Sequence, residues 1–73
     1  MADEVIPDFA RSYVDPMGRT QYAVDGPKGT WLITRDRDGA SWEVWASDTT
    51  RAVCRSHLLA NAFERAASHA GLR

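Results

Sequence analysis

Cysteine is nearly absent from this chain of 73 residues, and histidine is rare. The single cysteine, Cys54, cannot form a disulfide within the chain. His57 and His69 fall within an expected helix at positions that point in different directions, so they cannot share a metal ion without ligands from another chain. We therefore expect neither a metal site nor a cofactor.

Long hydrophobic segments are also missing. No stretch approaches the roughly 20 apolar residues that a membrane-spanning helix needs. The first residues, Met1–Pro7, contain neither a basic leader nor an apolar run. These absences predict a cytoplasmic protein.

Neither sign of charge is in excess: 9 Lys and Arg stand against 10 Asp and Glu, a formal net charge of −1. A protein that holds nucleic acid mainly by neutralising phosphates normally needs a strongly basic domain. The charges are nevertheless segregated, because residues 1–18 sum to −3 (one base, four acids) and residues 50–73 to +3 (four bases, one acid). This balance favours a protein partner and disfavours nucleic acid without excluding it.

No arrangement of side chains suggests catalysis. A nucleophile needs a base and an orienting group beside it, and none is evident around Cys54. Arg51 and Arg55 could lower the pKa of this thiol, but a half-buried structural cysteine is the simpler interpretation. No glycine-rich segment joins a strand to a helix in the way of a phosphate-binding loop. We expect a protein that is not an enzyme.

The strongest pattern that is present is Asp38-Gly39 between two β-favouring runs, residues 30–35 and 41–46. It predicts a type I′ hairpin, and the turn-forming cluster over residues 25–29 predicts another strand before it. The resulting register pairs Ile33 with Val44, Trp31 with Ala46, Arg35 with Trp42, Leu32 with Trp45 and Thr34 with Glu43, and places Tyr22 and Val24 beside Ile33 and Trp31. The face with Ile33 is the expected core face.

The structure of the segment before this sheet stays open. Phe9–Val14 can form an edge strand, because residues 15–18 suit a β-turn. A short helix that starts at Pro7 is the alternative. Both interpretations send Phe9 and Tyr13 inward, and we slightly favour the strand.

The last segment lacks proline and, until Gly71, glycine, which predicts a helix from about Thr49 to Ala70. Ser47 or Asp48 is the expected N-cap, and Gly71 the residue that ends the helix. The expected buried face holds Ala52, Ser56, Leu59, Phe63, Ala66, Ala67 and Ala70.

Together these elements predict an α+β fold, a three- or four-stranded antiparallel meander packed on one C-terminal helix. Residues 1–18 are the N-terminal arm or edge strand, and residues 19–73 the core domain. Hydrophobic residues make up 44% of the chain, which is enough for one small core.

Two surfaces of this fold are candidates for binding. On the sheet face away from the helix, Leu32 lies opposite Trp45, an anchor typical of interface hot spots, unless the N-terminal arm covers it. One side of the expected helix carries Arg51, Arg55, Leu58, Ala62, Arg65 and His69. The apolar centre of this helix side favours a partner groove, a dimer contact or the arm over a merely solvated side. The predicted partner-binding residues are Leu32, Trp45, Arg51, Arg55, Leu58 and Arg65.

Three antiparallel strands followed by one amphipathic helix resemble the DNA-binding domain of plant ethylene-response factors and the arm-type DNA-binding domains of phage and transposon integrases. The resemblance runs over about residues 22–67: residues 29–31 open the second strand, residues 42–45 form the third, and Asp48-Thr49 leads into an alanine-rich helix. It implies that the exposed sheet face reads DNA with Arg, Lys and Trp side chains. Here that face offers Trp45 and Thr34, but also Glu43.

In size, in near-neutral but segregated charge and in its lack of a catalytic motif, the chain also resembles small inhibitors encoded by phages and mobile elements, anti-CRISPR proteins among them. This resemblance implies a non-enzymatic module, in the cytoplasm of a bacterial host, that binds a subunit of a nucleic-acid-processing complex and occludes it. A protein partner tolerates balanced charge, whereas DNA disfavours the acidic side chains around the sheet. Protein binding is therefore our first expectation, DNA binding of the integrase-arm type the alternative, and a homodimer over Trp45 or Leu58 a third possibility.

Overall fold

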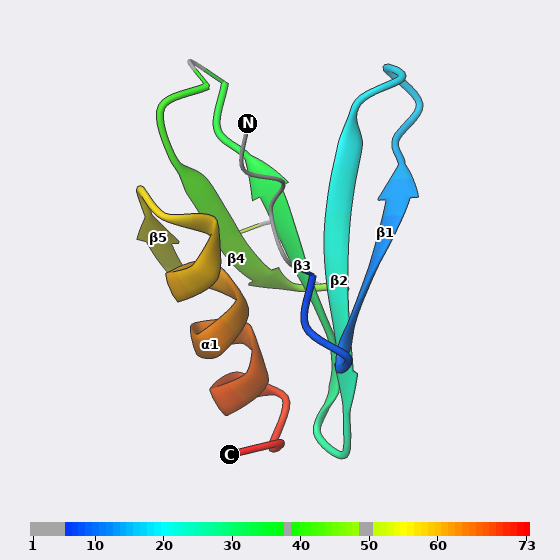
Figure 1. Ribbon diagram of the computed structural model, residues 1–73, viewed down its shortest axis with the longest axis vertical. Coiled ribbons are helices and arrows are strands. Elements are labelled where there is room, and N and C mark those ends of the chain that lie inside the picture. The colour runs from blue at the N-terminus through cyan, green and yellow to red at the C-terminus, as the bar shows by residue number, and fades with distance from the viewer. Residues whose placement is uncertain (1–5, 38, 49–50) are drawn as a thin grey trace.

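One helix lies across one face of a five-stranded antiparallel sheet (Figure 1). The structure is a computed structural model that describes residues 6–37, 39–48 and 51–73. Its elements are β1 (Ala10–Val14), β2 (Thr20–Gly26), β3 (Gly29–Arg35), β4 (Trp42–Ala46), β5 (Cys54–Ser56) and α1 (Leu59–His69). Each strand pairs with the next along the chain. The predicted α+β meander on a C-terminal helix is confirmed, with five strands instead of three or four.

The predicted register of the central strands is confirmed. Across β3 and β4 the pairs are Trp31–Ala46, Leu32–Trp45, Ile33–Val44, Thr34–Glu43 and Arg35–Trp42, and across β2 and β3 Tyr22 and Val24 pair with Ile33 and Trp31. At the turn between β3 and β4, the amide of Gly39 donates to the carbonyl of Asp36 at 2.9 Å, and Gly39 has a φ of 75°. The predicted two-residue type I′ turn is wrong, because the Asp36 amide donates to the Ser41 carbonyl at 2.8 Å and four residues lie between this pair. Asp38, the other predicted turn residue, lies outside the described residues.

The predicted start of the helix is wrong. The helix begins at Leu59, and its N-cap is Leu58, which makes no side-chain cap hydrogen bond. Neither Ser47 nor Asp48 caps it, and residues 49–50 lie outside the described residues.

Two physical causes account for the late start. Residues 54–56 form β5 and pair with the far side of β4, whose backbone groups would otherwise be an unpaired edge. The hydroxyl of Ser56 then accepts the Leu58 amide at 3.2 Å and donates to the Leu58 carbonyl at 3.0 Å. Such local bonds from a serine compete with helical hydrogen bonding, so the helix starts only after them.

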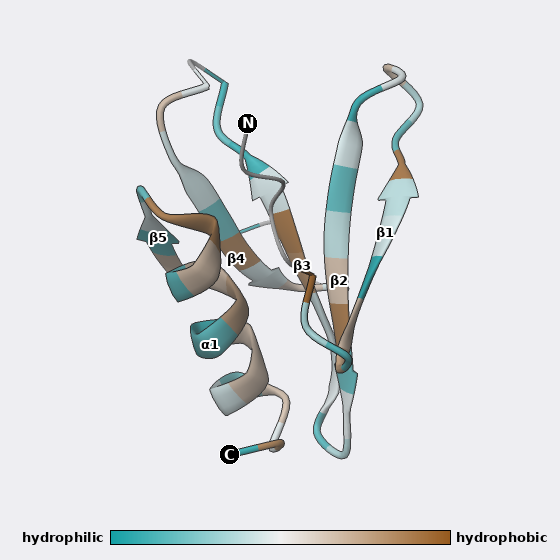
Figure 2. Ribbon diagram, in the orientation of Figure 1, coloured by the Kyte–Doolittle hydropathy of each residue, from teal (hydrophilic) through white to brown (hydrophobic). Residues whose placement is uncertain are grey.

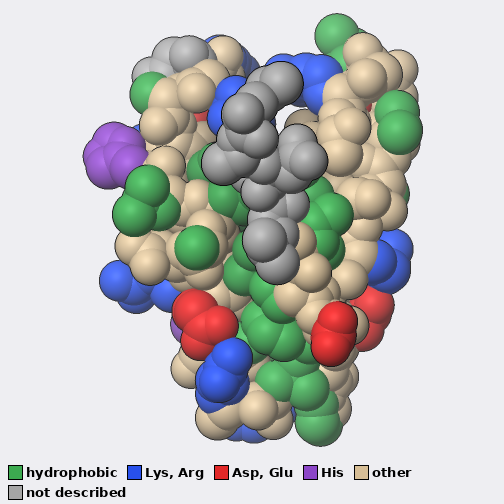
Figure 3. Space-filling view, viewed as in Figure 1, with side chains coloured by type: hydrophobic (Ala, Val, Ile, Leu, Met, Phe, Trp, Pro, Cys, Tyr) green, Lys and Arg blue, Asp and Glu red, His purple; other side chains and the backbone are tan. Residues whose placement is uncertain are grey.

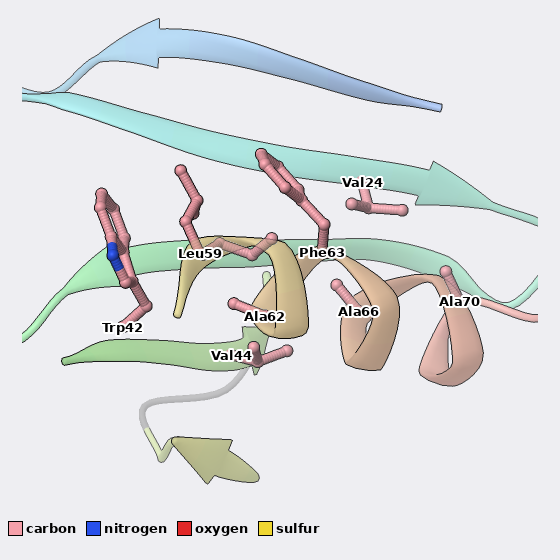
Figure 4. Close-up of a cluster of buried hydrophobic side chains, with 9 residues drawn as sticks. Val24, Trp42, Val44, Leu59, Ala62, Phe63, Ala66 and Ala70 are labelled. Carbon is pink, nitrogen blue, oxygen red and sulfur yellow. The ribbon is translucent and has the colours of Figure 1, made fainter. Parts of the chain in front are cut away.

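The helix buries one side against the sheet (Figures 2 and 4). The helical residues Leu59, Ala62, Phe63 and Ala66 and the C-cap Ala70 pack with Val24, Ile33, Trp42 and Val44, and Ala67 is buried as well. The ring of Phe63 meets the ring of Tyr22 edge to face, with centroids 5.3 Å apart. Of the seven predicted inward positions, Ala52 is wrong, since it precedes β5 and is exposed. Ser56 is half-buried as the partner of Trp42, but in β5 and not in the helix. Ala62, expected on the flank with Leu58 and Arg65, is 0% exposed because it lies three residues after Leu59 and four before Ala66, on the same helical face.

The C-terminal end of the helix is confirmed. Gly71 has a φ of 87°, and the amide of Leu72 donates to the carbonyl of Ala67 at 2.9 Å, as in a Schellman motif. The β2–β3 turn closes against this end, because the Lys28 amide donates to the carbonyl of Ala70 at 2.8 Å. In the described part of the chain, no helix is long and apolar enough to cross a membrane.

The segment before β2 forms the edge strand β1, as favoured, but its two aromatic residues separate. Phe9 packs against the core on the helix side, where apolar side chains gather between α1 and the β1–β2 hairpin (Figure 3). Tyr13 points to the opposite face of the sheet, where it pairs with Gln21 and lies near Trp45, so its expected inward position is wrong. The cause is the turn at residues 8–9, closed by the Ala10 amide on the Pro7 carbonyl at 3.0 Å, which breaks the strand alternation before β1.

Candidate functional site

The sheet face opposite α1, called the outer face below, is ordered in rows of side chains. Cross-strand partners stand next to each other on a sheet, so the register places Ala23, Leu32 and Trp45 in one apolar row. Arg11 is the β1 neighbour of Ala23 at the end of that row. The adjacent row is polar and holds Tyr13, Gln21, Thr34, Glu43 and Arg55.

A concavity of about 350 Å³ opens on this face. Tyr13 on β1 and Trp45 on β4 stand on its two sides, with Leu32 on β3 between them. The rest of its lining is Asp15, Pro16, Arg19, Gln21, Thr34 and Arg35. A smaller hollow of about 120 Å³ lies against the same Trp45, lined also by Thr34, Glu43 and Ala52. Trp45 thus borders two adjacent hollows.

The floor of the concavity is held in place by hydrogen bonds. Gln21, only 2% exposed, donates from Nε2 to Asp15 Oδ2 at 2.9 Å and accepts the Arg35 amide on Oε1 at 3.0 Å. Trp45 donates its indole N–H to Thr34 Oγ1 at 3.0 Å. Since these polar atoms already have partners, the floor offers an entering group a fixed shape and mainly apolar contact.

Arginines on the outer face are matched by carboxylates. Arg11 on β1 bonds Asp25 on β2 at 2.8 Å, and Arg55 on β5 bonds Glu43 on β4 at 3.1 Å and lies 3.7 Å from Asp36. The Arg11 guanidinium holds the pKa of the Asp25 carboxyl below its ordinary value, with a further hydrogen bond from Thr30. The face is therefore mixed in charge, with no basic stripe along its strands.

Tyr13 and Asp15 stand together at the rim of the concavity. Partial burial raises the pKa of the Tyr13 hydroxyl, and the nearby Asp15 carboxylate raises it further. The pKa of Asp15 is lowered, first by the hydrogen bond from Gln21 and then by the Arg19 amide. At neutral pH the rim thus presents a phenol that can donate a hydrogen bond beside an ionised carboxylate.

The structure brings three of the six predicted binding residues to one face. Leu32 and Trp45 are direct cross-strand partners, both half-buried, and Arg55 joins them from β5. Arg51 lies in the loop before β5.

The remaining two predicted binding residues lie elsewhere. Leu58 is the N-cap of α1 and is 62% exposed, and Arg65 is exposed on α1. The predicted line of arginines along one helix is wrong, because Arg51 and Arg55 precede the helix. Tyr13 lines the concavity, on the side of the sheet opposite to the one predicted for it, although its alternation with Ser12 inside β1 could have located it.

Cys54 is half-buried at the start of β5, as expected for a structural thiol. Burial raises its pKa, and the charge of Arg65 acts in the opposite direction. Within residues 6–37, 39–48 and 51–73, no three His, Cys, Asp or Glu side chains gather as metal ligands.

The chain was compared with protein-family models, curated proteins and solved structures. None of them matches. A function for the chain therefore has to be inferred from the chemistry of the outer face itself.

Proposed function

We propose that the chain is a protein-binding module that uses its outer face, with Trp45 and Leu32 as the central anchor. The observation that carries this proposal is the Leu32–Trp45 pair at the edge of a preformed concavity, on the face opposite the helix. Aromatic anchors surrounded by polar groups are typical of the few residues that dominate protein interfaces. The part of the N-terminal arm that the structure describes supports an open face, because Phe9 packs on the helix side.

The matching occupant is an apolar side chain of leucine or aromatic size on a partner protein. The concavity of about 350 Å³ is lined by the apolar side chains of Leu32 and Trp45 and the ring of Tyr13, among polar residues. The ion pairs Arg11–Asp25 and Arg55–Glu43 around it suit a partner rim with both signs of charge. DNA would instead demand cations that face the phosphates, and these two arginines already serve carboxylates.

We propose more specifically that the partner is a subunit of a nucleic-acid-processing complex and that the chain inhibits this complex by covering that subunit. The support for this form is the resemblance in size, segregated charge and lack of a catalytic motif to small phage-encoded inhibitors such as anti-CRISPR proteins. The integrase-arm alternative predicts salt-sensitive, micromolar binding to random duplex DNA. A gel shift at low salt with no complex at tens of micromolar protein would reject it.

Affinity capture tests the face and the specific form separately. The wild type, Trp45→Ala, Tyr13→Ala and the control Leu58→Ala are immobilised and exposed to lysate of cells that encode the chain. The proposal expects a protein that the wild type and Leu58→Ala retain and that Trp45→Ala and Tyr13→Ala lose. Retention by all four variants rejects the outer face. If the protein that the wild type retains and Trp45→Ala and Tyr13→Ala lose is unrelated to nucleic-acid processing, the outer face stands as the binding surface. Only the proposed occlusion of a nucleic-acid-processing complex is then rejected.

A further inference from the structure

We propose that the outer edge of β1, which has no neighbouring strand among the described residues, pairs with β1 of a second copy of the chain. The pairing is antiparallel and centred on Ser12, so that two sheets join into one. β1 ends the sheet on one side, and β5 ends it on the other. β1 is the longer of the two edges, with five residues against three in β5. This inference does not depend on the outer-face proposal, although Arg11 and Tyr13 of β1 also lie on the outer face.

The backbone of β1 offers the groups that such a pairing needs. The Asp15 amide donates to the Arg19 carbonyl at 2.9 Å, which marks this pair as hydrogen-bonded. In an antiparallel ladder, hydrogen-bonded and non-hydrogen-bonded pairs alternate. The backbone N–H and C=O groups of Ser12 and Val14 therefore point away from β2, toward the open edge.

A two-fold axis at Ser12 satisfies these groups. Ser12 then faces Ser12 of the second copy and exchanges both backbone hydrogen bonds with it. The Val14 amide of each copy donates to the Ala10 carbonyl of the other copy. The Ala10 amide is already used by the Pro7 carbonyl at 3.0 Å, so about four backbone hydrogen bonds form across the axis.

The side chains of β1 match under the same two-fold axis. On the helix side, Val14, which is 69% exposed, comes to lie opposite the small Ala10 of the second copy. On the outer face, Arg11 comes to lie opposite Tyr13 of the second copy, where a guanidinium and a phenol ring attract each other. No like charges meet in this register, and an apolar side chain that is exposed in the monomer gains cover.

Features that usually protect an edge strand are missing from β1. Natural edges carry lysine, proline, a bulge or an inward-pointing charge. Residues 10–14 contain one charged residue, Arg11, and its guanidinium is drawn toward Asp25 on β2 at 2.8 Å. Because the sequence of β1 is self-complementary, it favours β1 of a second copy over an unrelated peptide strand as its pairing partner.

Sedimentation equilibrium tests the inference with a matched pair of variants. Ser12→Lys places two ammonium groups at the axis, whereas Ser68→Lys makes the same change at an exposed position of α1. A five-residue strand pairing is a small interface, so the protein is examined from about 10 µM to about 500 µM. We expect the wild type and Ser68→Lys to rise toward twice the chain mass of 8.1 kDa, and Ser12→Lys to stay at 8.1 kDa with an unchanged thermal melt.

Hydrogen exchange gives the register independently of any variant. We expect the amides of Ser12 and Val14 to become more protected as the protein concentration rises, and the amide of Ser56 on the other edge to stay unchanged. A wild type that remains a monomer at the highest concentration overturns the inference. So does association of Ser12→Lys with wild-type strength. Neither result would bear on capture of a partner through Trp45.

Discussion

Trp45 and Leu32 are cross-strand partners on the sheet face opposite α1, and Trp45 is oriented by a hydrogen bond to Thr34. The same register that sends Ile33 and Val44 into the core sends this pair to the other side, because side chains alternate along a strand. The half-buried pair on the outer face is thus a direct consequence of the strand pairing that builds the core. Loss of that register would remove both together.

Two adjacent leucines at the start of the helix test its observed boundary. Leu59 is 7% exposed and packs in the core, whereas Leu58 is 62% exposed. Leu59→Ala should lower the free energy of unfolding by about 2–5 kcal/mol, since it leaves a cavity. Leu58→Ala should change it by less than about 0.5 kcal/mol.

Urea denaturation of the two variants gives both values. Equal losses for both leucines would mean that the helix is rotated or starts elsewhere.

Gly26 is required where the β2–β3 turn meets the end of the helix. A Cβ at this position would lie 2.5 Å from the carbonyl oxygen of Ala70 and 2.8 Å from its Cβ. Gly26→Ala should therefore cost about 1–3 kcal/mol from overpacking against backbone and lower the melting temperature by about 4 °C or more.

Gly18→Ala is the control for Gly26→Ala. Gly18 has a φ of 82°, but a Cβ there meets no atom within 4 Å, so only backbone strain of about 1 kcal/mol is expected. If Gly26→Ala melts at the wild-type temperature in a calorimetric scan, the close approach of the turn and the helix is wrong.

Much of the sheet and the end of the helix follows from the sequence alone. Alternation of apolar residues on either side of Asp38-Gly39 is enough to pair Leu32 with Trp45, and Gly71 marks the helix end. These signals are local, since they depend on residues a few positions apart.

The missed features depend on contacts between distant residues. β5 forms because it pairs with the backbone groups on the edge of β4. An alanine-rich helical pattern does not show that these groups need a partner. Tyr13 was misplaced because the turn at residues 8–9 uncouples the side taken by Phe9 from the alternation within β1. The concavity combines residues from four strands and the β1–β2 turn, so only the assembled sheet shows it.

Asp15 should make stability depend on pH in the acid range. Its pKa is lowered in the folded state, chiefly by the hydrogen bond from Gln21 and the Arg19 amide. A lowered folded-state pKa contributes stability above the unfolded value of about 4 and loses it as pH falls through the folded value. Asp15→Asn should therefore be less stable than the wild type at pH 7 and lose less stability on acidification.

Melting temperatures of both proteins between about pH 7 and pH 2 measure this difference. Asp8→Asn, the same chemical change at an exposed carboxylate, is the control at pH 7. A wild type and an Asp15→Asn variant with parallel pH profiles would contradict the role assigned to this carboxylate.

Cys54 should react slowly with thiol reagents in the folded protein. Burial raises its pKa and partly shields its sulfur, so both the thiolate fraction and the access are reduced. We expect alkylation at pH 8 to be at least about tenfold slower in buffer than in urea. Equal rates under both conditions, with the folded state verified by circular dichroism, would place Cys54 outside the sheet.

The outer face, and Trp45 in particular, is the surface that we propose binds a partner protein. The most direct test is to titrate the captured partner into the wild type, Trp45→Ala and Leu58→Ala and to compare the dissociation constants. We expect Trp45→Ala to weaken binding by about 30-fold or more, equivalent to about 2 kcal/mol. We expect Leu58→Ala to weaken it by less than about threefold. All three proteins should remain folded at the assay temperature. Unchanged affinity for Trp45→Ala, or an equal loss for Leu58→Ala, would contradict it.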